Sequence, residues 1–264
     1  MKGRVLIVAG SDSGGGAGIQ ADIKAVTAMG GFAATAITAL TAQNTLGVHG
    51  VVPVDPAFIA QQIEVVLTDI GADALKTGML HSAEVIDTVV ASLRRHASGV
   101  PLVVDPVMVA SKGAHRLLLS DAETAMRDVL LPMATLLTPN LPEAEVLVGF
   151  PVRDEAAMRR AGEKLLSLGA KAVLMKGGHL EGDRLVDLLL HEGGVDRFED
   201  QRIASRNTHG TGCTLASAIA AGLAQKMSLR DAVARARAYV REAIVAAPGF
   251  GKGLGPLNHA VTIR

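Results

Sequence analysis

The stretch from Asn207 to Ala216, NTHGTGCTLA, places two glycines where a polar segment turns into an apolar helical pattern. The start of a helix offers backbone N–H groups that lack a partner and the positive end of the helix dipole. Gly210 and Gly212 would let a ligand come close to that backbone, because they carry no Cβ. This arrangement suits an anion, in particular a phosphate in transfer. A plain glycine turn before a helix explains the same residues equally well.

Cys213, the only cysteine of the chain, lies in the same stretch, so it cannot form a disulfide within the chain. In the first turn of a helix the pKa of a thiol can fall below its free value of about 8.5, which would make it reactive. Without further context, the better interpretation of a single cysteine is a small apolar residue that fills space.

Oxygen-bearing side chains at two other points could bind a metal ion with a phosphate. Asn140 and Glu143 lie three residues apart in TPNLPEAE, and Asp105 follows an apolar run. Mg²⁺ is usually held by one or two carboxylates together with waters and phosphates. Asn140 can equally be the N-cap of a helix with Glu143 in its first turn, and both roles are compatible.

Lys176 stands before two glycines in LMKGGH, where a lysine can reach a phosphate as a point charge, unless it is merely exposed at a turn. The first glycine-rich segment, GSDSGGGAG, fits neither the dinucleotide-binding pattern nor a P-loop, and a flexible turn is an open alternative. Asp22 follows it on an expected helix, where a solvated face is the simple interpretation. The histidines show no metal-ligand spacing, so no zinc site is predicted.

The elements that must position these residues alternate between short apolar strands and amphipathic helices. Strands are expected at residues 4–10, 32–44, 74–78, 101–107, 134–140 and 171–178, with an antiparallel pair at 184–194 and 195–204. Helices are expected at 18–29, 55–70, 83–95, 122–130, 142–148, 155–168, 214–224 and 229–246. This order predicts an α/β fold with a mostly parallel central sheet between helices on both faces, as one domain over residues 1–264. The polar segments follow the strands, so they should meet at one edge of the sheet.

Composition narrows the class of protein. The chain has 264 residues, of which 49% are hydrophobic and 2% aromatic, so a large aliphatic core is expected. Lysine plus arginine and aspartate plus glutamate both number 26, which gives no cationic surplus for nucleic acid or a membrane surface. No apolar run is long enough for a signal peptide core or a transmembrane helix, so a cytoplasmic protein is expected.

Taken together and in order, the motifs resemble those of the hydroxymethylpyrimidine/phosphomethylpyrimidine kinases of thiamine synthesis, in the ribokinase-like superfamily. The resemblance rests on AGSDSGGGAGIQADIKA, TALTAQNTLGV, KTGML, VVDPVM, LLTPNLPEAE, VLMKGGH, NTHGTGCTLASAIAAGL and GKGLGP, which span nearly the whole chain. It implies a three-layer ribokinase-like fold and an ATP-dependent kinase that converts 4-amino-5-hydroxymethyl-2-methylpyrimidine and its monophosphate to the diphosphate. ATP and Mg²⁺ are the implied cofactors, a monovalent cation is left open, and a homodimer is expected.

The resemblance also assigns roles to residues. Gly210, Thr211 and Gly212 resemble an anion hole, and Cys213 stands where other ribokinase-like enzymes have a catalytic aspartate. Gln43 resembles the residue that binds the amino and ring-nitrogen edge of the pyrimidine. The rest of that pocket would be Gly10, Asp22, Met79 and Val107. Lys176 and Asn140 resemble the ATP-binding residues, and Glu143 with Asp105 the metal-binding ones.

Three other functions compete with this interpretation. A pyridoxal kinase of the same superfamily is the nearest, because pyridoxal also offers a hydroxymethyl group on a six-membered aromatic ring. A pyrimidine-binding sensor without activity would not need both GTGC and NLPE. A nicotinamide-dependent oxidoreductase is disfavoured by the missing dinucleotide pattern.

Overall fold

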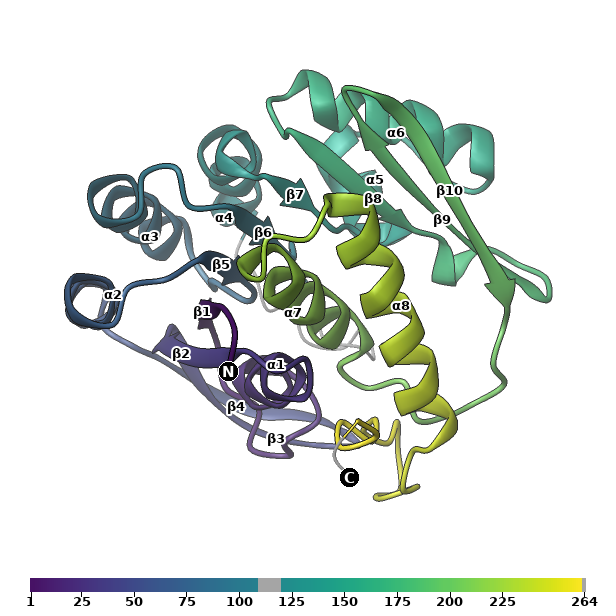
Figure 1. The fold of residues 1–264 in the computed structure, drawn as a ribbon, viewed down its shortest axis with the longest axis horizontal. Coiled ribbons are helices and arrows are strands. Elements are labelled where there is room, and N and C mark those ends of the chain that lie inside the picture. The colour runs from purple at the N-terminus through teal and green to yellow at the C-terminus, as the bar shows by residue number, and fades with distance from the viewer. Residues whose placement is uncertain (109–119, 263–264) are drawn as a thin grey trace.

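An eight-stranded sheet forms the centre of the part of the chain described by this computed structural model, residues 1–108 and 120–262 (Figure 1). The strand order is β10-β9-β8-β7-β6-β5-β1-β2. Within this sheet β2, β1, β5, β6, β7 and β8 are parallel to one another, whereas β9 runs antiparallel to both β8 and β10. Their bounds are β1 Arg4–Ala9, β2 Phe32–Ile37, β5 Ala74–Thr77, β6 Leu102–Val104, β7 Leu136–Leu137, β8 Ala172–Lys176, β9 Arg184–His191 and β10 Gly194–Gln201.

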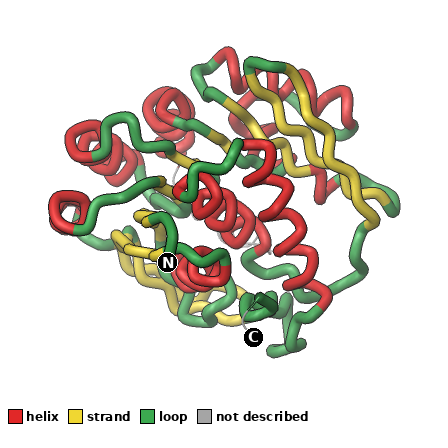
Figure 2. The backbone as a smooth tube through the Cα atoms, viewed as in Figure 1, coloured by secondary structure: helices red, strands yellow, loops and turns green. Residues whose placement is uncertain are grey.

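Helices cover both faces of this sheet, which makes three layers (Figures 1 and 2). One face carries α1 (Gly18–Ala28), α7 (Thr211–Ala224) and α8 (Leu229–Val245). The other carries α2 (Pro56–Asp69), α3 (Ala83–His96), α4 (Ser120–Ala125), α5 (Leu141–Val148) and α6 (Glu155–Ser167). Short η1 (Met126–Leu130), η2 (Leu131–Met133) and η3 (Gly177–His179) complete the described elements. The expected α/β class and the layers are therefore confirmed.

The alternation of side chains along β1 shows how the sequence builds two cores. Val5 and Ile7 pack with α1, α7 and α8, whereas Leu6 and Val8 pack with the helices of the opposite face. All four side chains are fully buried. Because successive residues of a strand point to opposite faces, a continuous apolar run is what a strand covered on both sides requires.

Helix α7 lies over the middle of the sheet between α1 and α8 (Figure 1). Its sequence, TGCTLASAIAAGLA, is rich in small residues, and ten of its residues are buried. A Cβ on Gly222 would lie 2.7 Å from that of Ala232, so the contact between α7 and α8 depends on the small residue. Small side chains thus let α7 pack closely, which fixes its N-terminus at the edge of the sheet.

The structure corrects the expected strand at residues 32–44, which breaks at Thr38 into β2 and β3 (Ala39–Asn44). The hydroxyl of Thr38 donates to the Met79 carbonyl at 2.6 Å, and its N–H donates to the Ala9 carbonyl at 3.0 Å. These contacts turn the chain away from the sheet, and β3 then pairs antiparallel with β4 (Gly47–Pro53). Strand β4 was not predicted.

The pairing of β3 with β4 shifts register between Ala42 and Gln43, as in a β-bulge. Such irregularities re-aim side chains and are common beside active sites. A second boundary also differs from the prediction, because α7 begins at Thr211 rather than at residue 214. The glycines of GTGC therefore belong to the first turn itself or cap it.

Two loops that are far apart in sequence meet at the N-terminus of α7. Gly210, the N-cap, has a φ of 79°, and a Cβ there would lie 1.8 Å from the carbonyl oxygen of Gly16. Only glycine tolerates both the left-handed backbone and this close approach. The contact joins the loop after β1 to the start of α7.

We predict that Gly210→Ala destabilises the protein clearly more than Gly30→Ala. Gly30 has nearly the same φ of 80°, but a Cβ on it would meet no atom of the described residues within 4 Å. The Gly30 variant should therefore lose only the backbone strain, about 1–2 kcal/mol in free energy of unfolding. Gly210→Ala adds the clash with Gly16. Urea unfolding of both variants measures the difference, and equal losses would contradict the close approach.

Candidate active site

A cavity of about 490 Å³ opens at the carboxyl ends of the parallel strands, as expected for an open α/β sheet. Its walls come from the loops after β1, β5, β6, β7 and β8, from β3, and from the first turn of α7. All the site residues predicted from the sequence line it except Asp22: Gly10, Gln43, Met79, Asp105, Val107, Asn140, Glu143, Lys176, Gly210, Thr211, Gly212 and Cys213. The structure thus brings these predicted residues together, while their roles stay predictions.

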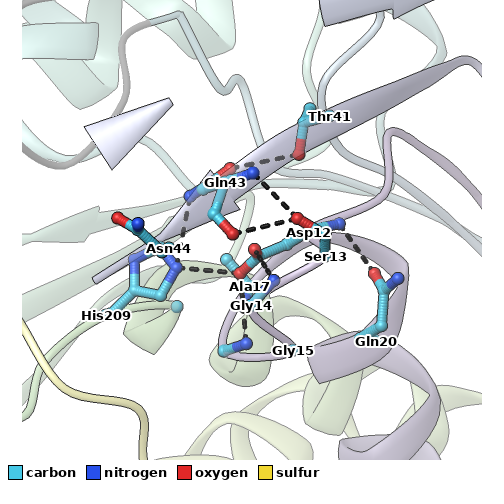
Figure 3. Close-up of polar contacts among 12 residues, drawn as sticks. Asp12, Ser13, Gly14, Gly15, Ala17, Gln20, Thr41, Gln43, Asn44 and His209 are labelled. Atoms are coloured by element: carbon cyan, nitrogen blue, oxygen red, sulfur yellow. Dashed lines mark hydrogen bonds and ion pairs between the residues drawn. The ribbon is translucent and has the colours of Figure 1, made fainter. Parts of the chain in front are cut away.

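Asp12 organises the glycine-rich loop after β1 (Figure 3). Its Oδ1 accepts a hydrogen bond from the Gly14 N–H at 2.8 Å, and its Oδ2 accepts from the Ala17 N–H at 2.8 Å. The ring nitrogen Nε2 of His209 lies 2.9 Å from the same Oδ2. Burial alone would raise the pKa of Asp12, but His209 and the backbone donors outweigh it and lower that pKa. A charged Asp12 therefore ties this loop to the residue before Gly210.

Strand β3 is attached to the same loop by its backbone. The Ser13 hydroxyl donates to the Gln43 carbonyl at 2.9 Å, and the Gln43 N–H donates back to that hydroxyl oxygen at 2.8 Å. The Thr41 hydroxyl donates to the Ser11 carbonyl at 2.8 Å. These bonds, with the bulge at Gln43, direct the glutamine side chain toward His209 (Figure 3).

Asp22 lies beneath the cavity and does not line it. Its fully buried carboxylate accepts from Lys76 Nζ at 2.8 and 2.9 Å and from the Ser217 hydroxyl at 2.7 Å. The interpretation of Asp22 as part of a solvated helix face is therefore wrong. Lys76 does line the cavity, and Gly78 makes room for it, since a Cβ there would lie 2.9 Å from Nζ. Asp22 can thus influence the cavity through this cation.

The Lys76 ammonium is fully buried, and a buried charge requires a compensating partner. Burial lowers the pKa of a lysine, but the Asp22 carboxylate, with smaller contributions from Cys213 and Asp105, raises the pKa of Lys76 overall. Burial also raises the pKa of Asp22, although Lys76 and Ser217 oppose that rise. Lys76 therefore keeps its proton and its positive charge at the floor of the cavity.

A second cation, Lys176, also lines the cavity. Lys176 Nζ is 3.1 Å from Asp105 Oδ1 and 4.0 Å from Glu143 Oε2. A Cβ on Gly212 would lie 3.2 Å from Lys176 Nζ and 3.7 Å from Asp105 Oδ2. The missing side chain at Gly212 therefore leaves the start of α7 open to this charged group.

Asn140 and Glu143 form a capping box at the start of α5. The Glu143 N–H donates to Asn140 Oδ1 at 2.9 Å, and the Asn140 N–H donates to Glu143 Oε2 at 2.8 Å. The N-cap interpretation is thus confirmed. Burial raises the pKa of Glu143 to about 7, although Lys176 acts in the opposite direction. Little free energy is then needed to move this carboxylate between its charged and neutral forms.

Cys213 is the third residue of α7 and lines the cavity. Burial raises the pKa of its thiol to about 12, Lys76 partly opposes this, and Asp22 and Asp105 add to it. The possibility that the helix start lowers this pKa is therefore not realised, because loss of solvent and two carboxylates outweigh Lys76. At neutral pH the sulfur is a thiol.

The N–H groups at the helix start are available to an anion. The first regular bond of α7 runs from the Thr214 N–H to the Gly210 carbonyl at 2.9 Å, so the N–H groups of Gly212 and Cys213 precede it. The Thr211 N–H contacts the Thr208 carbonyl at 3.3 Å, a long bond. This turn has the donors that an anion requires.

Part of the cavity wall is apolar. Met79 is 8% exposed and lies against Gly10, where a Cβ would come within 2.3 Å of its methyl carbon. Val107 lines the same cavity. A flat ring would fit between such side chains without displacing bound polar groups.

Several site residues were missed by the sequence analysis. Asp12, Thr41 and Lys76 stand inside quoted motifs, but no pattern distinguished them from their neighbours. Arg237 on α8 had no motif at all, yet it lines the cavity and donates to Asp187 Oδ2 at 2.8 Å. Its Nη2 has no hydrogen-bond partner within residues 1–108 and 120–262.

Two negative findings apply to the described residues only. Among them, no three histidine, cysteine, aspartate or glutamate side chains are grouped so that they could hold a metal ion by themselves. Nor does that part of the chain contain a helix with the length and hydropathy needed to span a bilayer.

The sequence is similar to that of known proteins over almost its full length. It is 52% identical to a thiamine biosynthesis bifunctional protein of Geobacter sulfurreducens, over 98% of this chain and 52% of that protein. The chain therefore spans about half the length of that relative. It is also 48% identical to the hydroxymethylpyrimidine/phosphomethylpyrimidine kinase of Rhizobium meliloti, over 96% of each.

Solved structures agree with this similarity. The phosphomethylpyrimidine kinase from Clostridium difficile has a TM-score of 0.82 at 42% identity, over 92% of this chain and 100% of that one. The pyridoxal kinase from Staphylococcus aureus in complex with AMP-PCP and pyridoxal has a TM-score of 0.91 at 33% identity, over 100% and 96%. The family model of phosphomethylpyrimidine kinase matches residues 12–258, and this chain belongs to that family.

Proposed function

We propose that the chain is an ATP-dependent kinase of thiamine biosynthesis. It phosphorylates the hydroxymethyl oxygen of 4-amino-5-hydroxymethyl-2-methylpyrimidine and then converts the monophosphate to the diphosphate. The observation that carries the proposal is a single cavity that joins the Gln43 amide, the Cys213 thiol, the free amides of α7 and the Lys176 ammonium. Family membership supports the same activity.

The pyrimidine binds at the inner end of the cavity in this proposal. Gln43 offers both a donor and an acceptor, which match an amino group beside a ring nitrogen. Met79 and Val107 contact the faces of the ring, and Gly10 leaves space for it. Asp22 contributes indirectly, since it holds Lys76 at the cavity floor.

Phosphoryl transfer then takes place at the first turn of α7. The transition state is loose, so catalysis needs alignment and charge neutralisation more than a strong base. The N–H groups of Gly212 and Cys213 and the Lys176 ammonium neutralise the transferring group, with Gly210 and Thr211 shaping the turn. Cys213 positions the attacking hydroxyl, because a thiol with a pKa of about 12 is a poor base at neutral pH.

Mg²⁺ fits the carboxylates present here. Asp105 and Glu143 supply hard oxygen ligands, and two carboxylates with phosphates and waters are a usual Mg²⁺ environment. Lys176 balances both carboxylates, so the phosphates of ATP would compete for its charge. A bound Mg²⁺ would neutralise phosphate charge.

A monovalent cation remains part of the proposal, and replacing potassium by choline in the assay would test it.

The nucleotide occupies the outer end of the cavity. Asn140 and Lys176 border the phosphates, and ATP use agrees with the AMP-PCP complex of the related pyridoxal kinase. Farther out, the apolar side chains of Leu185, Val240 and Ile244 suit a base. Arg237 also lines the cavity, where it holds Asp187.

A pyridoxal kinase is the second candidate, favoured by the TM-score of 0.91 to the Staphylococcus aureus enzyme. Its identity of 33% is lower than the 48% shared with the Rhizobium meliloti pyrimidine kinase. The pyrimidine is therefore the preferred substrate in this proposal.

Three further parts of the proposal concern the whole molecule. Residues 1–264 form one domain, and the protein acts in the cytoplasm. It is a homodimer, since Leu40, Val52, Phe58 and Val65 leave apolar surface exposed on β3, β4 and α2. Light scattering measures the subunit number, and a monomer would exclude the dimer.

Purified protein with ATP, Mg²⁺ and the pyrimidine should release ADP, with a higher kcat/KM than with pyridoxal. Omission of Mg²⁺ should abolish the release, because phosphate charge is then not neutralised. A coupled ADP assay measures both. Binding of the pyrimidine without ADP release would indicate a sensor, and turnover of pyridoxal alone would support the second candidate.

Cys213→Ala should lower kcat by roughly 10²-fold while the KM for ATP changes by less than about threefold, because the thiol contacts the attacking group and not the nucleotide. Cys213→Ser is the matched control, since it keeps a hydrogen-bonding group and should retain more activity. Steady-state kinetics with varied ATP decides. An unchanged kcat in the alanine variant means that the sulfur takes no part.

The alkylation rate of Cys213 by iodoacetamide should rise about tenfold per pH unit up to at least about pH 10, because only the thiolate reacts and its fraction grows in this way below the pKa. The signal is unambiguous because the chain has no other cysteine. Mass spectrometry follows the reaction. A plateau already near pH 8 would show that burial does not raise this pKa.

A further inference from the structure

The Gln43 side chain makes two polar contacts within the cavity wall. Its Nε2 lies 3.3 Å from His209 Nε2, and its Oε1 lies 3.4 Å from the Thr41 hydroxyl oxygen (Figure 3). Whether either contact is a hydrogen bond depends on where the protons of His209 and Thr41 are.

The contact with Asp12 determines which ring nitrogen of His209 carries a proton. Its carboxylate is charged and therefore only accepts, and its Oδ2 lies 2.9 Å from His209 Nε2. The short contact thus requires a proton on Nε2 of His209. A protonated ring nitrogen cannot accept from the amide nitrogen of Gln43, so this contact brings two donors together.

The Ser11 carbonyl determines the direction in which the Thr41 hydroxyl donates its proton. The Thr41 hydroxyl donates to the Ser11 carbonyl at 2.8 Å, and a hydroxyl has only one proton. The longer contact to Gln43 Oε1 at 3.4 Å then receives none. In this orientation, neither end of the Gln43 amide has a complementary partner in His209 or Thr41.

A half-turn of the amide about its last side-chain bond resolves both conflicts. The oxygen and nitrogen exchange places with little change of shape. The carbonyl then faces the His209 Nε2–H as the longer, 3.3 Å branch of a bond that this N–H makes mainly to Asp12, and the NH₂ group donates to a lone pair of the Thr41 oxygen. No contact in the chain from Asp12 through His209 and Gln43 to Thr41 and Ser11 then brings two donors or two acceptors together.

We propose that His209 and Thr41 are specificity-determining positioning residues, which fix the Gln43 amide with its carbonyl toward His209 and its NH₂ toward Thr41. The second lone pair and the second N–H of the amide remain for the ligand, in a defined order. A ring with an amino group beside a ring nitrogen matches that order in one pose only. This inference rests on the proposed function for the identity of the ligand, but not for the orientation of the amide.

His209 is well placed to act as this reference point. It is 8% exposed, and its backbone N–H donates to the Gly255 carbonyl at 3.1 Å. It immediately precedes Gly210, so the imidazole of His209 is attached to the turn that binds the phosphoryl group in the proposed function. The order of donor and acceptor at Gln43 is thereby coupled to the site of transfer.

Nitrogen-15 NMR of the intact protein without ligand tests the orientation directly. Long-range proton–nitrogen spectra should show a proton on Nε2 of His209, assigned by its loss in His209→Asn. The Gln43 NH₂ protons should give a nuclear Overhauser effect to the Thr41 methyl group. An unprotonated Nε2, or NH₂ protons that are near the His209 ring instead, would overturn the proposal.

Kinetics test the consequence for specificity. Thr41→Val keeps the shape but removes the acceptor, so the KM for the pyrimidine should rise roughly 5- to 10-fold, the effect of one lost hydrogen bond. The KM for pyridoxal, which has no amino group beside a ring nitrogen, and the kcat should change by less than about twofold. Thr41→Ser keeps the hydroxyl and should behave as the unchanged protein.

The two tests separate the possible failures. Equal KM changes for both substrates in Thr41→Val, or equal effects of Thr41→Val and Thr41→Ser, would reduce Thr41 to a structural role and overturn the proposal. If the unchanged protein does not phosphorylate the pyrimidine, the proposed function fails instead. The NMR result then still decides the orientation of the amide.

Discussion

The meeting of two loops at the start of α7 is the constraint on which the rest of the site depends. Asp12 and His209 are 197 residues apart in sequence, yet they are in direct contact. Beside them the Gly16 carbonyl occupies the space that a side chain on Gly210 would need. Through Ser13 the same loop holds Gln43. One junction therefore sets the distance between the candidate ring-binding end and the candidate transfer site.

The charges of the cavity form two neighbouring groups around Lys76 and Lys176, and Asp105 acts on both. Lys76 is balanced by Asp22 beneath the floor, where water does not reach it. Lys176 is shared by Asp105 and Glu143. The first group is closed and gives a permanent field, whereas the second has more carboxylate than ammonium. In the proposed function, that surplus is what a divalent cation would neutralise as the phosphates of ATP arrive.

This arrangement also explains how a kinase could work with a thiol in place of a carboxylate. Because burial raises the pKa of Cys213, the sulfur is protonated at neutral pH and is not available as a base. Phosphoryl transfer through a loose transition state requires precise alignment of the reacting groups more than it requires a strong base. Packing of α7 between α1 and α8 positions the donors at its first turn, and Asp22 holds the Lys76 cation, so alignment is what this site can supply.

Local patterns in the sequence predicted what depends on local chemistry. The apolar run of β1 and the capping residues of α2 and α5 gave correct elements, because periodicity and caps act within a few residues. The break of a predicted strand at Thr38 was not foreseen, because the hydrogen-bond partner of Thr38, Met79, lies 41 residues away in sequence. The burial of Asp22 and the raised pKa of Cys213 depend on Lys76 and on packing, which no spacing in the sequence reveals. The contact of Asp12 with His209 was missed for the same reason.

A crystal structure with the pyrimidine and a non-hydrolysable ATP analogue tests the central claim most directly. The account predicts the pyrimidine ring against Gln43 and its hydroxymethyl oxygen beside Cys213. The terminal phosphate should lie within hydrogen-bond distance of the Gly212 N–H, with the junction of Asp12 and His209 intact. A ring bound away from Gln43, or a terminal phosphate remote from the first turn of α7, would contradict it.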